Sequence, residues 1–247
     1  MSGHSKWSTI KRKKGANDAA RAKVFTKLAR EISVAVKEGG TDPNNNSRLR
    51  DLLAKGRAAN VPQDNLMRAI KKAEGDDKTS YESIVYEGYG HSGIAVIVEC
   101  LSDNRNRTAS NVRHYFDKFG GNLGTSGCVS FMFEDKGIIV CEEENVDEEK
   151  ALEACMEAGA NDVSFEEEGI IEFETDPSQV GNVANALREM GYNVTSAEAS
   201  KVPNNYTKVE DEEALRKLAL FFDALDEDDD VQNVYNNLEN TEDLPEL

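Results

Sequence analysis

The residues of this chain best suited to chemistry are its N-terminal lysines and arginines, because each can neutralise one phosphate of a nucleic acid. Residues 1–17 contain no acid and five bases. The predicted phosphate contacts here and just beyond are Lys6, Lys11, Arg12, Lys13, Lys14, Arg21, Lys23, Lys27 and Arg30. Trp7 could stack on an unpaired base, which suits RNA better than duplex DNA, or could pack against the protein.

Charge is unevenly distributed along the chain. The net charge of the 247 residues is −18. Residues 1–80 hold 18 Lys and Arg against 9 Asp and Glu, whereas residues 81–247 hold 11 against 38. The first part is therefore at +9 and the second at −27. Such a division predicts a nucleic-acid-binding segment on an acidic body, although a patchy, solvated surface would have a similar composition.

Two further basic groups could contact phosphate. The first is Arg68, Lys71 and Lys72, in a predicted helix that follows a turn of the length found in helix-turn-helix motifs. Asp64 begins that helix, so phosphate contact is favoured over reading of bases in the major groove. The second is Arg105 and Arg107 at a predicted helix N-terminus, which favours anions. Helix capping and ion pairs with neighbouring acids are the alternative there.

The sequence does not predict a catalytic site. The chain has three histidines and four cysteines, without a CxxC pair or a zinc-finger spacing. Each cysteine lies in an apolar run, which predicts a buried thiol in a reducing compartment. Clusters such as 142–144 are consecutive carboxylates whose side chains diverge, so they indicate solvated charge. We expect no enzyme activity, no cofactor, no metal and no small-molecule substrate.

The elements that position the basic residues follow from the hydrophobic pattern. Apolar residues at helical spacing predict helices over 18–37, 47–59 and 64–73, with a basic exterior. Strands are expected at 83–86, 93–100 and 129–133, with a helix over 108–119. A helix over 211–223 and a strand over 231–235 come last, and the acidic run 226–230 between them is predicted to be a solvated turn.

Residues 137–201 alternate in the order β-α-β-β-α-β, which predicts a ferredoxin-like domain with 3 basic and 17 acidic residues over 137–202. The predicted fold is α+β and multidomain: an N-terminal three-helix domain, a discontinuous α+β domain and an inserted ferredoxin-like domain. The predicted boundaries are a basic arm at 1–17, then 18–78, then 79–136 with 203–240, an insertion at 137–202, and an acidic tail at 241–247.

Several long stretches resemble one family. They are SGHSKW with the following IKRKKGANDAARAKVFTKLAREI, NVPQDNLMRAIKKAEG, VYEGYG with GIAVIVECLSDNRNRTASNVRHYF, and GGNLGTSGCVSFMF. Together they are similar to the YebC/PmpR family of regulatory proteins over essentially the whole chain. One departure is His91-Ser92, where the family commonly has Pro-Gly after the EGYG turn.

The resemblance implies three domains and a cytoplasmic, DNA-binding transcriptional regulator. Family relatives are also linked to translation, so a ribosome-associated factor that binds ribosomal RNA and assists elongation through difficult sequences is an alternative. A third possibility is an acidic protein-interaction scaffold. No apolar stretch approaches 18 residues, so a membrane partner is not expected.

Overall fold

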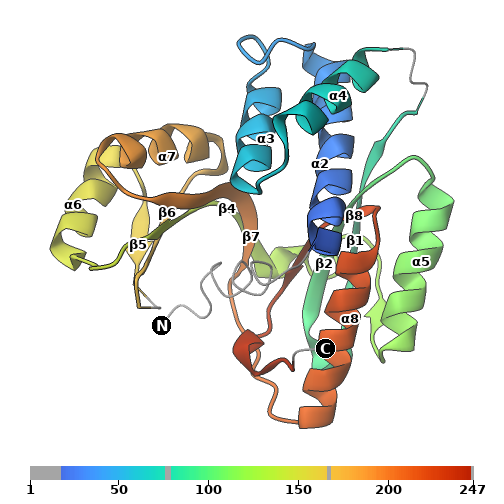
Figure 1. Cartoon of the computed structure of the whole chain (residues 1–247). Coiled ribbons are helices and arrows are strands. Elements are labelled where there is room, and N and C mark those ends of the chain that lie inside the picture. Colours follow the sequence, from blue (N-terminus) through green and yellow to red (C-terminus); the bar gives the residue numbers. More distant parts are fainter. Residues whose placement is uncertain (1–17, 76–78, 166–167, 246–247) are drawn as a thin grey trace. The chain divides into compact units, whose positions relative to one another are not determined.

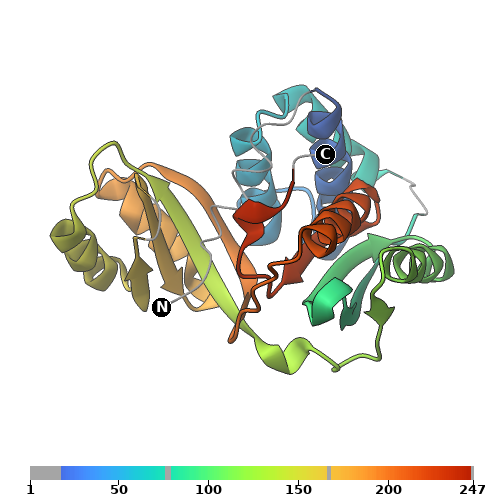
Figure 2. The ribbon, with the colours of Figure 1, turned by 90° about the horizontal axis from the view of Figure 1, so that it is seen from below.

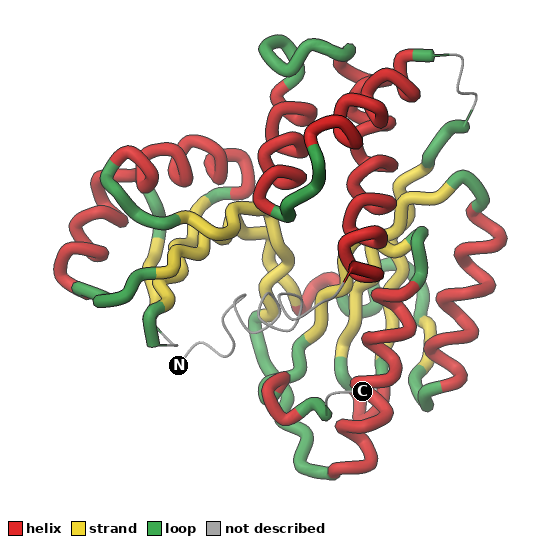
Figure 3. Tube along the Cα trace, in the orientation of Figure 1, coloured by secondary structure: helices red, strands yellow, loops and turns green. Residues whose placement is uncertain are grey.

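A computed structural model describes residues 18–75, 79–165 and 168–245 of the chain. The fold is α+β with several domains, as expected (Figures 1 and 3). The chain forms two compact units. Of the described residues, the N-terminal unit contains 18–129, 210–236 and 244–245, and the second, ferredoxin-like unit contains 130–209 and 237–243. The finer boundaries predicted above stay a prediction, and the basic arm 1–17 lies outside the described residues.

Three helices begin the N-terminal unit. They are α2 (Asp18–Gly39), α3 (Ser47–Ala58) and α4 (Gln63–Glu74), within two residues of their predicted ends. Ile32, Leu49 and Leu66 are completely buried among them. Asn46 connects two of the helices, since its side chain accepts from Leu49 N at 3.0 Å and donates to the Ala35 carbonyl at 2.7 Å. These contacts join the end of α2 to the start of α3.

An antiparallel sheet completes this unit. Its strands are β1 (Glu82–Tyr89), β2 (Ala95–Ser102), β3 (Asn122–Leu123) and β8 (Val231–Asn236), in the order β3-β1-β2-β8. Helices α5 (Arg105–Lys118) and α8 (Glu212–Glu227) pack side by side (Figure 2). The rings of Phe116 and Phe221 between them are 4.8 Å apart in an edge-on contact. Strand β8 thus belongs to the same sheet as β1, β2 and β3, although the ferredoxin-like unit separates it from them in the sequence.

The predicted strand over 129–133 is wrong. Ser130–Met132 form a short 3-10 turn, and the Phe131 side chain is 72% exposed. The edge of the sheet is taken by β3 instead. Gly88 in β1 permits this, because a Cβ there would lie 2.5 Å from the carbonyl oxygen of Asn122. The apolar pattern alone could not distinguish these two segments as the partner of β1.

The ferredoxin-like unit has the predicted element order. Its elements are β4 (Phe133–Glu142), α6 (Glu148–Ala158), β5 (Asp162–Ser164), β6 (Ile170–Thr175), α7 (Val180–Glu189) and β7 (Val194–Pro203). The sheet order β5-β6-β4-β7 is antiparallel throughout. Helices α6 and α7 cover one face of this sheet (Figures 1 and 2), over a core that includes Ile139, Phe173 and Leu187. Strand β4 begins at Phe133, earlier than expected, because it pairs with β7 as far as Pro203.

Candidate nucleic-acid interface

Three of the predicted phosphate-binding side chains follow one another along α2. Lys23, Lys27 and Arg30 are spaced by four and three residues, which places them on one side of a helix. Lys23 Nζ lies 3.0 Å from Glu227 Oε1, and Lys27 Nζ lies 3.0 Å from Asp226 Oδ1. Both acids are in the last turn of α8. With the three aspartates that follow, they make up what we call the acidic segment, 226–230.

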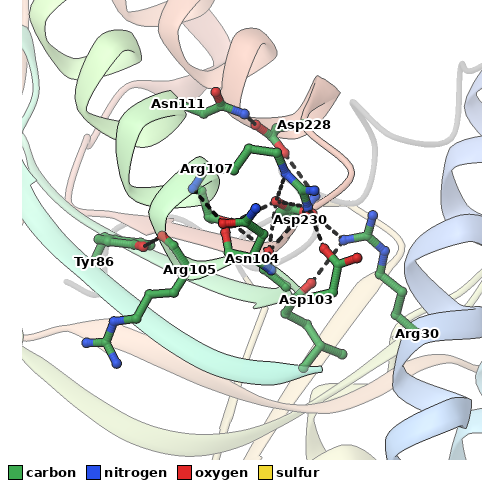
Figure 4. A network of polar contacts seen from close by, with 12 residues as sticks. Arg30, Tyr86, Asp103, Asn104, Arg105, Arg107, Asn111, Asp228 and Asp230 are labelled. Carbon is green, nitrogen blue, oxygen red and sulfur yellow. Dashed lines mark hydrogen bonds and ion pairs between the residues drawn. The ribbon is translucent and has the colours of Figure 1, made fainter. Parts of the chain in front are cut away.

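Asp230, at the end of the acidic segment, is the centre of a polar network (Figure 4). Its carboxylate accepts hydrogen bonds from Arg30 Nη1 at 2.5 Å and from Arg107 Nη2 at 2.9 Å. Two hydroxyls, Thr108 Oγ1 at 2.7 Å and Ser102 Oγ at 3.0 Å, donate to the same carboxylate. One carboxylate therefore connects α2, the end of β2 and the start of α5.

The prediction of a solvated turn at 226–230 is wrong at both ends. Asp226 and Glu227 belong to α8, which continues four residues beyond its predicted end at 223. Asp230 is only 2% exposed. The reason lies in the sheet, because Leu101 N donates to the Asp230 carbonyl at 2.7 Å where β2 meets the start of β8. Pairing of these two strands draws the end of the acidic segment into the protein. A buried carboxylate is tolerated when charged and polar donors surround it, as they do here.

This environment predicts an acid-dependent loss of stability. Burial by itself raises the pKa of Asp230, but the hydrogen bonds from Arg30, Thr108, Arg107 and Ser102 outweigh it and lower the pKa from 3.8 to about 2. A lowered pKa stabilises the folded state above the unfolded-state value, and this contribution disappears as pH falls from about 4 to about 2. The expected loss is about 2 kcal/mol.

The measurement is urea unfolding of the wild type and Asp230→Asn at pH 5 and at pH 2.5. Because the asparagine cannot titrate, the free energy of unfolding of the variant should fall less between the two pH values. Equal decreases in the two proteins would mean that Asp230 has an ordinary pKa in the folded state.

The carboxylate of Asp228 accepts hydrogen bonds from side chains of α5. Its Oδ2 accepts from Asn111 Nδ2 and from the Tyr115 hydroxyl, both at 3.1 Å. Its Oδ1 accepts from Asp230 N at 2.9 Å. Burial, together with the nearby Asp228 carboxylate, raises the pKa of Tyr115 to about 12. The acidic segment thus has polar partners on α5 as well as basic partners on α2.

The ion pairs between α2 and the acidic segment differ in burial. The side chains of Lys23 and Glu227 are 38% and 73% exposed, whereas those of Arg30 and Asp230 are 16% and 3% exposed. An exposed pair contributes about 0–1 kcal/mol to stability and is screened by salt. Breaking a buried pair from one side costs about 3–5 kcal/mol, because the remaining charge loses its partner. Of these ion pairs, the buried Arg30–Asp230 pair is therefore the strongest and the exposed Lys23–Glu227 pair the weakest.

Lys27 lies between these extremes. Its side chain is 15% exposed, and Nζ donates to the Asp226 backbone carbonyl at 2.9 Å as well as to the Asp226 carboxylate. That carbonyl belongs to the last turn of α8, where helix carbonyls lack intrahelical partners and the helix dipole is negative. Lys27 therefore also acts as a C-terminal cap for α8.

At the start of α5, the structure favours the capping interpretation for Arg107. Asn104 Oδ1 accepts from the Arg107 backbone N at 3.1 Å, and Arg107 Nη2 reaches Asp103 at 2.8 Å besides Asp230. These partners raise the pKa of Arg107, with the bond to Asp230 as the largest cause. Arg105 turns away from this network (Figure 4) and pairs at 3.0 Å with Glu82 on the exposed surface. Phosphate binding by either arginine stays a prediction.

The exposed faces of α3 and α4 carry the remaining predicted contacts. Arg68, Lys71 and Lys72 are all exposed on α4. The structure adds Arg50 and Arg57, which are exposed on α3 and were not predicted. Their spacing of seven residues, two helical turns, is the signal that could have identified them.

The remaining predicted contacts lie where the structure gives no side-chain position. Lys6, Trp7, Lys11, Arg12, Lys13 and Lys14 are outside the described residues. Arg21 is within α2, but its side chain is not among those described. Of the predicted set, the structure therefore brings Lys23, Lys27, Arg30 and Arg107 together around the acidic segment. It places Arg68, Lys71, Lys72 and Arg105 on exposed surfaces.

Thiol chemistry has little support from the cysteine environments. Cys100, Cys141 and Cys155 are buried, as predicted, whereas Cys128 is only half-buried. Burial raises the pKa of Cys100 and of Cys141 to about 12, so both are thiols at neutral pH. Among the described residues, no group of three or more His, Cys, Asp or Glu side chains is arranged to hold a metal ion.

Comparison with known proteins places this architecture in a family. Residues 5–76 match the family model of the TACO1/YebC protein N-terminal domain, and residues 81–238 match that of the TACO1/YebC second and third domain. The chain belongs to the TACO1/YebC family, as its sequence motifs indicated. No helix in the described part of the chain is long and apolar enough to cross a bilayer.

Individual relatives match over almost their full length. A protein of Finegoldia magna named "Probable transcriptional regulatory protein" is 52% identical over 97% of this chain and 100% of its own. One of Persephonella marina with the same name is 48% identical over 100% and 99%. The crystal structure of a conserved hypothetical protein from Aquifex aeolicus is similar, with a TM-score of 0.80 and 43% identity over 90% of this chain and 91% of that one.

Proposed function

We propose that this chain is a nucleic-acid-binding regulatory protein, and more narrowly a DNA-binding transcriptional regulator, that contacts the phosphate backbone through its N-terminal third. The observation that carries the proposal is the set of exposed bases on α3 and α4, which are Arg50, Arg57, Arg68, Lys71 and Lys72. They belong to the same basic third of the sequence as the N-terminal arm. The names of the relatives from Finegoldia magna and Persephonella marina support a regulatory role.

The acidic remainder supports contact through the N-terminal third alone. Residues 137–202 carry 3 bases against 17 acids, and a surface of this charge repels a phosphate backbone. In the proposal the ferredoxin-like unit does not contact the nucleic acid and is free to act as a spacer or a partner surface. The proposed protein works in the cytoplasm without enzyme activity, cofactor or small-molecule substrate.

One observation favours ribosomal RNA as a second candidate target. Asp64 is exposed in the first turn of α4, where a recognition helix would meet base edges in the major groove. A carboxylate at that position opposes entry next to phosphates. Contacts to the backbone alone suit a structured RNA as well as a duplex. In this alternative the protein is a ribosome-associated factor that assists elongation.

The deciding experiment offers the full chain ribosomes and random-sequence duplex DNA together at near-physiological salt, and reads the partition by sedimentation. Retention on DNA supports the transcriptional role, and transfer to ribosomes supports the translational one. Absence of salt-sensitive binding to either would contradict the proposal and favour the scaffold interpretation.

Replacement of exposed bases tests whether α4 contacts the nucleic acid. Arg68→Ala with Lys71→Ala is expected to weaken binding and to reduce the slope of log K against log salt by about 2, roughly one per lost phosphate contact. The matched control is Lys150→Ala with Arg188→Ala, two exposed bases on α6 and α7. We expect the control to bind like the wild type, and equal loss in both variants would contradict the assignment to α4.

A further inference from the structure

We propose that the acidic segment 226–230 occupies the place of nucleic-acid phosphates on α2, and that nucleic acid must displace its outermost carboxylate, that of Glu227, to engage Lys23. This inference rests on the proposed function, because it describes how further basic side chains of the N-terminal third, those on α2, are kept from phosphate. It gives the acidic segment the role of an internal competitor for phosphate.

The geometry supports the substitution of carboxylates for phosphates. Lys23, Lys27 and Arg30 extend over about 10 Å of α2, given a rise of 1.5 Å per residue. Each meets a separate carboxylate, on Glu227, Asp226 and Asp230 respectively. Three anionic oxygen groups thus face three cations in a row. Lysine and arginine recognise the oxygens of a phosphate with the same donors.

The difference in burial indicates which contacts can exchange. The carboxylate of Asp230 has hydrogen bonds from three elements and remains in place. Glu227 and Lys23 are exposed at the outer end, so their pairing is weak and sensitive to salt. Lys23 needs only a side-chain rotation to leave Glu227 for a phosphate.

Competition has a measurable consequence for the salt dependence of binding. In the wild type, Lys23 neutralises a phosphate and releases a cation from the duplex, but the Glu227 carboxylate that it leaves attracts a cation, so the net release is small. Without that carboxylate, the cation that Lys23 releases from the duplex is not offset. Glu227→Gln should therefore bind duplex DNA about two- to fivefold more tightly at low salt. Its slope of log K against log salt should also be steeper by up to about 1.

Asp229 is the matched control. It is exposed in the same segment, and Asp229→Asn removes the same charge while every ion pair described above between α2 and the segment is retained. General electrostatic repulsion predicts equal gains for the two variants. The proposal predicts a larger gain for Glu227→Gln.

A double-mutant cycle completes the test, with binding of a random-sequence duplex measured by fluorescence anisotropy over a salt series. In the Lys23→Gln background, Glu227→Gln and Asp229→Asn should increase the affinity for duplex DNA equally, because the Lys23–Glu227 pair no longer exists. The proposal would be overturned if Glu227→Gln still increased the affinity more than Asp229→Asn in this background. It would also be overturned if the two variants had equal affinities in the presence of Lys23. Absence of salt-sensitive binding by the wild type and by every variant would overturn the proposed function itself, which distinguishes the two failures.

Discussion

Replacement of Asp230 by alanine is expected to lower the free energy of unfolding of the N-terminal unit by about 4 kcal/mol, because a buried and fully hydrogen-bonded carboxylate is removed. Arg30, whose side chain is 16% exposed, would lose its charged partner and keep only the neutral Leu101 carbonyl, 3.0 Å from its Nη1, as a hydrogen-bond acceptor. The hydroxyls of Thr108 and Ser102 would lose a charged acceptor, which adds to the cost. Urea denaturation followed by circular dichroism measures the change.

Two other substitutions test whether the network is responsible. Asp229→Ala removes an exposed carboxylate one residue away and should change the free energy of unfolding by less than about 0.5 kcal/mol. Asp230→Asn retains the shape of the side chain and one acceptor oxygen. Its decrease in the free energy of unfolding should therefore lie between those of Asp229→Ala and Asp230→Ala. If Asp230→Ala unfolds at the same urea concentration as Asp229→Ala, the network does not stabilise the protein.

Deletion of residues 2–14 is expected to weaken nucleic-acid binding about a hundredfold at near-physiological salt. The deletion removes Lys6, Lys11, Arg12, Lys13 and Lys14, and the slope of log K against log salt should decrease by about 4 to 5 because each base neutralises one phosphate. Filter binding or fluorescence anisotropy over a salt series measures both quantities. Unchanged affinity would contradict the prediction that the N-terminal arm binds phosphate.

Two variants of the same arm separate charge from base stacking. An arm with all five bases replaced by glutamine keeps Trp7 and should reproduce most of the loss caused by the deletion. Trp7→Ala keeps the charges. It should leave binding to duplex DNA unchanged but weaken binding to single-stranded RNA by about 1–3 kcal/mol if the indole stacks on a base. Equal effects of Trp7→Ala on both nucleic acids would favour packing of Trp7 against the protein.

The position of the acidic segment gives the uneven charge distribution a structural meaning. The sequence separates a basic first third from an acidic remainder, but the structure brings part of the two together within one unit. Lys23, Lys27 and Arg30 contact carboxylates about 200 positions further along the chain. Arg50, Arg57, Arg68 and Lys71 on α3 and α4 are exposed, so a first encounter with phosphate is expected there.

Local patterns in the sequence were sufficient to predict most of the helices and strands. Helices α2, α3 and α4 were predicted to within two residues, because their apolar stripes and their terminating Gly and Pro residues act over a few positions. The β-α-β-β-α-β order of the ferredoxin-like unit was confirmed for the same reason. The division of charge and the family motifs are also properties of the sequence alone, and they were enough to predict the family and the fold class.

Only the tertiary structure decided which distant segments meet. The edge strand of the first sheet is β3 rather than 129–133, because Gly88 permits a close backbone approach that the apolar pattern does not record. Asp230 is buried because β8 pairs with β2, although its four acidic neighbours in sequence are typical of a solvated turn. Sequence patterns report the preferences of neighbouring residues, whereas strand pairing and the partners of a charge depend on contacts between residues far apart in the chain.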